Sequence, residues 1–429
     1  MKIIVNPLSE TLPELLQRPA MDHAALYLVV QDVLDAVKKE GDKAVAAYTQ
    51  KFDGVTIDNA TVSEAAMNEA ALALSPALKE AIQLAAKNIR CFHEAQVSEP
   101  LKIETMPGVN CWRKSVGIDK VGLYIPGGSA PLFSTVLMLG IPAVIAGCKE
   151  IILCTPPSKD GSVHPAILYA ASVVGITQIF KIGGVQAIAA MAYGTETVPQ
   201  VYKIFGPGNQ YVTAAKQLVQ QNGVAIDMPA GPSEVCVLAD ETCNPGFVAS
   251  DLLSQAEHGP DSQVLLVSTS SKVVDEINEA LTAQLAVLPR KDIAQQALEN
   301  SKAIVVDSMD QAIFIVNSYA AEHLIIACKN DETIGEQITN AGSVFLGNYS
   351  PESVGDYASG TNHTLPTSGY ARAYSGVSVD SFVKIITYQK LTPTGLQAIG
   401  AAVETMAAAE GLEAHKNAIT IRLQSLKKI

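Results

Sequence analysis

From residue 121 onward, short apolar segments of strand length alternate with longer segments of helical character. The expected strands form two series, 121–125, 150–154, 178–182, 201–205 and 224–226, then 235–238, 263–268, 303–306, 323–327 and 343–346. Strands that alternate with helices form mostly parallel sheets, because each helix returns the chain to the same edge of the sheet. The pattern therefore predicts an α/β protein with two Rossmann-like parallel-sheet domains that are only partly similar to each other.

The segments on either side of these series have helical patterns. Apolar residues keep a helical period from Val30 to Val37, and Gly41 follows where a helix would end. Ser75 precedes a proline and begins a second expected helix. Further helices are expected at 394–411 and around 415–426. This tail is too small to bury a core of its own, so we expect it to dock on another domain or another subunit.

Length, charge and cysteine content limit the class of protein. The chain has 429 residues, enough for two or more domains, and a formal net charge of -13. Nucleic acid is excluded as a partner, because binding it needs a basic face that neutralises phosphates. The seven cysteines never have the spacing Cys-x-x-Cys, so neither a disulfide framework nor a zinc knuckle is expected. These features favour a cytoplasmic enzyme that acts on small metabolites.

One uncharged segment has the length and composition of a membrane-spanning helix. Residues 121–148 carry no charged side chain and are numerous enough to cross a bilayer of about 30 Å. Prolines and glycines interrupt the stretch, among them Gly140 and Pro142. They leave the apolar pieces 121–125, 133–139 and 144–146. Such pieces are typical of a buried βαβ unit, and no membrane association is expected.

Three glycine turns, 126–128, 183–184 and 206–208, follow expected strands of the first series. Ligands of open α/β sheets bind beyond the carboxyl ends of the strands, where these turns would converge. The turn at 206–208 opens a helix whose first amides can receive phosphate. Tyr211 occupies the place of the third glycine of the dinucleotide motif, although Asp227 lies at the expected distance for its acidic residue. A nucleotide cleft and plain glycine turns both remain open.

Two further patterns could carry chemistry. Gln255 and His258 place two potential metal ligands on adjacent turns of an expected helix end, although on spacing alone a polar helix end stopped by Gly259 is the better explanation. Glu322 and His323 could supply a general base and a proton shuttle. Successive strand residues point to opposite faces, so both can serve one substrate only if the junction before the strand is irregular. A helix-to-strand turn is the alternative.

A third set of polar residues is dispersed along the C-terminal part of the chain. It comprises Asp356, His363, Glu410 and His415. Metal ligands need not be close in sequence, so spacing cannot test whether these residues act together. Each of them alone is typical of a surface or capping position.

Taken together, several segments resemble the histidinol dehydrogenase family in sequence and in order. They are 121–131 (VGLYIPGGSAP), 184–189 (GVQAIA), 205–209 (FGPGN), 226–234 (IDMPAGPSE), and the segments around Gln255 and Glu322. The resemblance covers essentially the whole chain. It implies oxidation of L-histidinol to L-histidine, the last step of histidine biosynthesis, in two NAD-linked steps through an aldehyde held on the enzyme. It also implies one zinc ion per site.

The resemblance also assigns roles to individual residues. It implies that the zinc ligands are Gln255, His258, Asp356 and His415, which also bind substrate with Ser233, His323 and Glu410. It implies that Tyr124, Gln186 and Asn209 line the NAD site. Glu322 and His323 resemble the catalytic pair: His323 would accept the alcohol proton, and Glu322 would activate water for the second oxidation. His363 is given only a structural role, and His23, His93 and His164 none.

The family's tail crosses to the neighbouring subunit, which implies a homodimer whose composite sites take Glu410 and His415 from the partner chain. The implied domains are 21–117 with 233–377 for zinc and catalysis, 118–232 for NAD, 1–20 with 378–388 as a connecting domain, and the tail 389–429.

A different mechanism, in which a cysteine forms a thiohemiacetal with the aldehyde, would use Cys111, which has basic neighbours, or Cys236.

Overall fold

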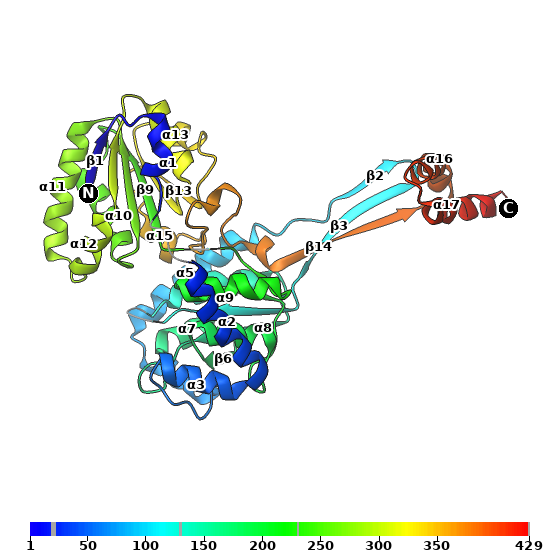
Figure 1. Ribbon diagram of the computed structural model, residues 1–429, viewed down its shortest axis with the longest axis horizontal. Coiled ribbons are helices and arrows are strands. Elements are labelled where there is room, and N and C mark those ends of the chain that lie inside the picture. Colours follow the sequence, from blue (N-terminus) through cyan, green and yellow to red (C-terminus); the bar gives the residue numbers. More distant parts are fainter. Residues whose placement is uncertain (19–22, 128–130, 230, 428–429) are drawn as a thin grey trace. The chain divides into compact units, whose positions relative to one another are not determined.

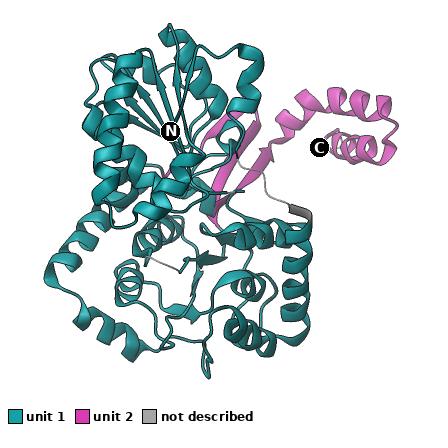
Figure 2. Cartoon of the chain, turned by 60° about the vertical axis from the view of Figure 1, so that its left-hand side comes forward, with its two compact units in different colours: residues 1–96, 118–382 teal, residues 97–117, 383–429 magenta. Residues whose placement is uncertain are grey.

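The computed structural model describes residues 1–18, 23–127, 131–229 and 231–427 (Figure 1). These residues form two compact units (Figure 2). Unit 1 consists of Met1–Gln96 and Ile118–Phe382, and unit 2 consists of Val97–Gly117 and Val383–Ile429. Gly128 of the first glycine turn, with two further residues of that motif, and Ala230 of the segment 226–234 lie outside the described residues.

The first sheet of unit 1 has six parallel strands. Their order is β1 (Lys2–Val5), β11 (Lys302–Val305), β10 (Gln263–Ser268), β9 (Glu234–Ala239), β12 (His323–Ala327) and β13 (Ser343–Leu346). In the central strand β9, Val235 and Val237 pack on one helical layer, while Cys236 and Leu238 pack on the other. The two layers are α10 (Pro245–Ala256), α11 (Ser271–Val287) and α12 (Lys291–Glu299), and α1 (Leu12–Leu15) with α13 (Met309–Tyr319) (Figure 1).

The second sheet of unit 1 has five parallel strands. Their order is β6 (Gln178–Lys181), β5 (Glu150–Thr155), β4 (Lys120–Tyr124), β7 (Lys203–Phe205) and β8 (Ala225–Ile226). One face packs on α4 (Glu64–Ala73), α5 (Pro76–Glu94), α6 (Phe133–Ile145) and α7 (Pro165–Val174). The other packs on α2 (His23–Glu40), α3 (Asp42–Phe52), α8 (Gly184–Tyr193) and α9 (Gln210–Gln221). Both faces are therefore buried, which explains why the strands are apolar except at their ends.

The two sheets share one topology. Numbered within its own series, each has the order 3-2-1-4-5 of doubly wound α/β folds, and β1 is an extra strand beside β11. The α/β prediction is confirmed, because every expected strand is present with ends that differ by at most two residues. Short helices complete the unit: η1 (Ser9–Thr11), α14 (Asp331–Gly335), α15 (Glu352–Tyr357), η2 (Tyr370–Arg372) and η3 (Val379–Phe382).

Unit 2 contains an antiparallel sheet that the sequence pattern did not indicate. Its order is β14 (Val383–Leu391), β3 (Val109–Gly117) and β2 (Lys102–Met106). Gly108, with a φ of 81°, makes the tight turn between β2 and β3. The expected tail helices follow as α16 (Pro393–Ala409) and α17 (Glu413–Leu426), and they approach closely where Gly400 faces Leu423.

The prediction that prolines and glycines divide residues 133–146 was wrong, because this segment is the single helix α6 with Pro142 inside it. Proline has no N–H to donate to the carbonyl four residues earlier. That carbonyl, on Met138, instead accepts a hydrogen bond of 2.6 Å from the Asn362 side chain. A long-range contact thus satisfies the group that the proline leaves free. Among the described residues, no helix is long and apolar enough to cross a membrane.

Candidate functional site

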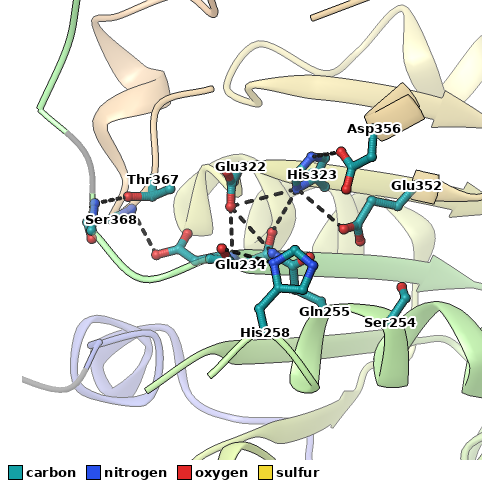
Figure 3. A network of polar contacts seen from close by, with 12 residues as sticks. Glu234, Ser254, Gln255, His258, Glu322, His323, Glu352, Asp356, Thr367 and Ser368 are labelled. Carbon is teal, nitrogen blue, oxygen red and sulfur yellow. Dashed lines mark hydrogen bonds and ion pairs between the residues drawn. The ribbon is translucent and has the colours of Figure 1, made fainter. Parts of the chain in front are cut away.

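Polar residues gather at the amino ends of β9 and β12, two neighbouring strands of the six-stranded sheet (Figure 3). Ser233 directly precedes β9, and His323 begins β12, where it is paired in register with Val235. The five-stranded sheet, by contrast, places its glycine turns at the carboxyl ends of its strands. The carboxyl-end rule for open α/β sheets therefore applies to only one of the two sheets.

Glu322 and His323 lie together at the beginning of β12. Ala320 ends the preceding helix with a φ of 54°, a left-handed conformation that is uncommon for alanine. Glu322 lies before the first strand residue, and its Oε2 accepts from the Glu234 N–H at 2.9 Å. The same oxygen lies 3.7 Å from Nδ1 of His323. The junction is thus irregular, as the sequence argument required for both side chains to face one substrate.

Three carboxylates surround the buried imidazole of His323 (Figure 3). Besides Glu322, Glu352 of α15 lies 4.0 Å from Nδ1, and Asp356 lies 3.4 Å from Nε2. Burial lowers the pKa of His323, but the charges of the three carboxylates outweigh it and raise that pKa to about 10. Burial raises the pKa of Glu322 and that of Glu352 to about 8. The pocket is therefore rich in acidic groups, with His323 as their common partner.

Gln255 and His258 reach the same pocket from the end of α10. Gln255 is fully buried, and with its amide nitrogen facing Glu352 its oxygen accepts from the Glu234 N–H at 2.9 Å. His258 lies one turn beyond, with Nδ1 3.4 Å from Oγ of Ser233. Surrounding protein lowers the pKa of His258 by desolvation, so the imidazole is neutral at pH 7. The polar helix end is therefore part of the pocket.

The chemistry of these donors fits a divalent cation. Buried acidic groups outnumber the cationic side chains beside them, and a cation offsets that surplus of negative charge. His323, Glu352 and Asp356 offer ligand atoms that all lie within 4.8 Å of one another. Metal ligands must be deprotonated, a condition that His258 and Asp356 meet, because their pKa values are lowered. The raised pKa of His323 makes it a poorer ligand, so we favour Gln255, His258 and Asp356.

The remaining two implied substrate and metal residues belong to unit 2. Glu410 directly follows α16, and His415 lies in the first turn of α17. Both side chains are exposed in their own unit. Unit 1 alone thus brings together Ser233, Gln255, His258, Glu322, His323 and Asp356, while Glu410 and His415 are presented separately.

Two cavities of unit 1 adjoin at Asn209. The first, of about 510 Å³, is lined by Ser233, His258, Glu322 and Asn209 among others. The second, of about 820 Å³, lies at the carboxyl ends of the five-stranded sheet and is also lined by Asn209. Its other lining residues include Tyr124, Gly127, Gly184 and Gln186. The glycine turns therefore line cavities as the sequence indicated, and one residue connects the polar cluster with the turns.

Close contacts leave the backbone of the turn at 206–208 no room for a side chain at Gly206. A Cβ on Gly206, where φ is 129°, would lie 2.1 Å from the carbonyl oxygen of Tyr124. The next helix is capped by Asn209, whose Oδ1 accepts from the N–H groups of Tyr211 and Val212 at 3.1 Å each. The side chain of Asn209 therefore already satisfies two of the amides at this helix start that were expected to be available to phosphate.

Asp227 also differs from its expected role. Its carboxylate accepts from the N–H groups of Gly206 and Met228, both at 2.8 Å, and forms an ion pair with the buried Lys216. Lys216 in turn donates to the carbonyl of Gly206 at 2.8 Å. Asp227 and Lys216 thus fix the N–H and the carbonyl of Gly206. The carboxylate supports the turn and is not presented to a ribose.

Removing one partner of this buried pair should destabilise unit 1. We expect Lys216→Met to lower the free energy of unfolding by about 3–5 kcal/mol, because Asp227 stays buried without its counter-charge. Urea denaturation followed by circular dichroism measures the loss. The control is Lys149→Met, which removes an exposed pair with Asp119 at 2.7 Å and should cost less than about 1 kcal/mol. Equal losses in the two variants would show that burial of the Lys216 pair adds nothing.

Sequence reasoning missed several residues that organise the pocket. Arg18 donates two hydrogen bonds of 2.8 Å to the Glu234 carboxylate and lies 4.0 Å from the centre of the Tyr319 ring. Glu234 also accepts from the Ser368 N–H at 2.8 Å. A glutamate at the start of an otherwise apolar strand was a usable signal, because a buried charge requires a partner. Glu352 gave no such signal, since it lies in a polar segment.

His363 contacts the backbone of Asp356. Its Nδ1 lies 2.8 Å from the Asp356 carbonyl oxygen, and its Nε2 lies 3.0 Å from Oγ1 of Thr135. A carbonyl only accepts, so Nδ1 carries the proton and Nε2 accepts from the threonine hydroxyl. The neighbouring Asn362, which bonds Met138, anchors this segment to α6. His363 therefore supports the position of Asp356.

The structure excludes one of the two cysteines proposed as the nucleophile of the thiohemiacetal mechanism. Cys236 is fully buried between β9 and the layer of α1 and α13, and burial raises the pKa of its thiol. A protonated thiol without access to a cavity cannot attack an aldehyde. Cys111 lies in β3 of unit 2, where it is paired in register with Gln389.

Comparison with known proteins identifies close relatives across the whole chain. The histidinol dehydrogenase family profile matches residues 16–423. Histidinol dehydrogenase from Bacteroides thetaiotaomicron is 60% identical over 427 residues, covering 100% of both chains. The enzyme of that name from Aliivibrio fischeri is 54% identical and covers 96% of this chain and 94% of its own. The crystal structure of histidinol dehydrogenase from Elizabethkingia anophelis has a TM-score of 0.97 at 56% identity, covering 100% of this chain and 99% of its own.

Proposed function

Because the chain belongs to the histidinol dehydrogenase family, a family of oxidoreductases, we propose that it oxidises L-histidinol to L-histidine in two NAD-linked steps with a bound zinc ion. Each turnover consumes one water and two NAD and yields two NADH. The observation that carries this proposal is the cluster of Glu322 and His323 beside Gln255, His258 and Asp356. Two members of this cluster, His258 and Glu322, line one cavity, and Asn209 lines both that cavity and a second one of about 820 Å³.

His323 is the base of the first step. Gln255, His258, Asp356 and His415 of the partner subunit would hold zinc, which would supply a positive charge that helps to bind the substrate and lowers the pKa of nearby groups. His323, relieved of its proton, accepts the proton of the alcohol as hydride leaves for NAD. Asp356 lies 3.4 Å from Nε2 and Glu352 lies 4.0 Å from Nδ1, and their negative charges stabilise the imidazolium that forms.

Glu322 is the base of the second step. It activates a water that adds to the aldehyde carbon, and the resulting gem-diol releases a second hydride to give the acid. Its Oε2 lies 3.7 Å from Nδ1 of His323, which supports a role for both bases at one substrate carbon in turn. Burial keeps Glu322 away from bulk water, as the raised pKa of about 8 reflects. A carboxylate in such surroundings is a stronger base than an exposed one.

The second cavity is the proposed NAD site. Tyr124, Gln186 and Asn209 line it, and the Tyr124 hydroxyl accepts from the Gly184 N–H at 3.1 Å, which links two of the glycine turns. The volume suits a large ligand. Asn209 lines both cavities, so in this arrangement it would contact both NAD and the substrate.

The proposed active site needs two chains. Glu410 and His415 are exposed in unit 2, so each is available to a neighbouring subunit. We propose a homodimer in which Glu410 contacts the substrate and His415 the zinc of the partner chain. The division into domains at 118–232 and 233–377, and a cytoplasmic location, belong to the same proposal.

Product analysis tests the function directly. The zinc-loaded protein is incubated with L-histidinol and NAD, and mass spectrometry follows the substrate. We expect L-histidine as the only end product, with no accumulation of aldehyde, since both steps occur at one site. A protein that contains stoichiometric zinc and forms no histidine would not have this function.

Glu322→Gln should separate the two half-reactions. We expect oxidation of supplied aldehyde to fall by about 10²–10⁴-fold, the contribution of a general base, while the first hydride transfer from histidinol falls far less. Rapid single-turnover measurements of NADH with each substrate give the two rates. Glu299→Gln, at an exposed position, is the control and should change neither. Equal loss of both half-reactions in Glu322→Gln would contradict the assignment of water activation to this residue.

A further inference from the structure

The cavity proposed for NAD lacks an acidic residue where this fold usually supplies one. In doubly wound sheets a carboxylate after the second strand commonly bonds the ribose 2′-hydroxyl of NAD. The second strand here is β5, which ends at Thr155 and is followed by Pro156 and Pro157. Asp227, the other candidate, is engaged by Gly206 and Lys216. The described part of this strand end therefore offers no carboxylate to a ribose.

Asp53 supplies a carboxylate from a different element. It directly follows α3, is half-buried and lines the cavity together with Gln186 and Thr155. Its Oδ2 accepts from Nε2 of Gln186 at 3.3 Å. Desolvation raises the pKa of Asp53, because the cavity wall removes water from the carboxylate. A ligand that donates hydrogen bonds to Asp53 would compensate for the lost water.

Two residues that line this cavity with Asp53 carry buried oxygen atoms without a hydrogen-bond partner among the described residues. Within the described residues, Oε1 of Gln186 and Oγ1 of Thr155 make no hydrogen bond, although both side chains are fully buried. The amide nitrogen of Gln186 is already used by Asp53, so its oxygen is left as an acceptor. Buried polar atoms are nearly always bonded in folded proteins. Two unpaired atoms in the wall of one cavity therefore indicate a ligand with hydroxyl or amine donors.

We infer that Asp53, with Gln186 and Thr155, makes this cavity select a dinucleotide with a free ribose 2′-hydroxyl over its 2′-phosphorylated form. The inference rests on the proposed function of the cavity as the NAD site. A ribose diol offers two donors to this acceptor-rich wall. A 2′-phosphate offers acceptors and a charge of about −1.5 to −2, which the Asp53 carboxylate repels. Lys159 and His164 also line the cavity but are exposed, so water screens their attraction for a phosphate.

Binding measurements on the full-length protein test this inference. Isothermal titration with NAD and with NADP gives two dissociation constants, for the wild type and for Asp53→Asn. A hydrogen bond to a charged group corresponds to about a 10- to 100-fold change in affinity. We expect Asp53→Asn to weaken NAD binding by that factor and to strengthen NADP binding, so that the preference for NAD collapses. Asp58→Asn, an exposed carboxylate five positions away with the same change of charge, should keep the preference.

The outcomes separate this inference from the proposed function. Preference for NAD that survives in Asp53→Asn would overturn the role of Asp53 while leaving the NAD site intact. Equal affinity of the wild type for NAD and NADP would overturn the selectivity itself. Binding of neither dinucleotide would reject the NAD site and the inference with it. If Asp53→Asn does not fold, Thr155→Val tests the same wall, and unchanged NAD affinity in that variant would count against it.

Discussion

Replacing His258 by alanine should remove zinc from the protein and reduce histidinol oxidation by about three orders of magnitude or more. The Lewis-acid contribution of a metal is several kcal/mol, and each 1.4 kcal/mol is about a factor of ten in rate. Among the proposed ligands, His258 is favourable for metal binding because desolvation lowers its pKa, which favours the neutral imidazole. Metal content by atomic emission and the initial rate of NADH formation measure the two effects.

The pH dependence of zinc retention follows from the same pKa. A protonated imidazole cannot bind metal, and the lowered pKa of His258 moves its protonation below pH 6.5. We therefore expect the wild type to keep its zinc through dialysis at pH 6.5 and to lose it only at lower pH. His164→Ala, which removes an exposed imidazole in the other cavity, should keep the wild-type metal content. A His258→Ala protein that retains full zinc would reject His258 as a ligand.

Mixing two inactive variants should restore activity if the tail crosses between subunits. His258→Ala lacks a ligand in unit 1, and His415→Ala lacks one in unit 2. In a mixed dimer one site combines both defects, and the other combines two intact parts. Random exchange makes half of the dimers mixed, with one active site of two, so about a quarter of the wild-type activity should return. Assays after subunit exchange, verified by native mass spectrometry, measure the recovery.

The matched control uses two defects in the same unit. Gln255 and His258 both belong to unit 1, so mixed dimers of Gln255→Ala and His258→Ala contain no intact site in any arrangement. This mixture should stay inactive. If the His258→Ala and His415→Ala mixture also stays inactive despite complete exchange, the sites do not take His415 from the partner, and the composite-site proposal is wrong.

The buried part of the fold was predictable because burial leaves a pattern in the sequence. Strands of the two parallel sheets are covered on both faces, so they appear as short apolar runs such as residues 263–268. The strands of unit 2 have no such pattern, since most residues of β2 and β14 are exposed. The prediction for the segment that forms α6 was wrong for another reason. Its Pro142 is tolerated because Asn362, more than two hundred positions away, bonds the carbonyl that the proline leaves free.

The candidate site was predictable where neighbours in sequence carry the chemistry. Gln255 with His258, and Glu322 with His323, were visible as pairs, and the structure brings both pairs to one pocket. Glu352 and Arg18 were not visible, because their roles exist only through contacts with residues far away in the chain. Asp227 does not have the ribose-binding role that its spacing from the glycine turn indicated. Distance in sequence does not reveal that its carboxylate forms an ion pair with Lys216.

The stoichiometry of hydride transfer tests the central claim most directly. Limiting L-histidinol is added to the zinc-loaded protein with excess NAD, and the NADH formed at completion is measured by absorbance. The account predicts two NADH for each histidinol consumed, falling to none when a chelator has removed the zinc. One NADH per histidinol, with free aldehyde as product, would contradict it, because Glu322 would then not carry the second oxidation.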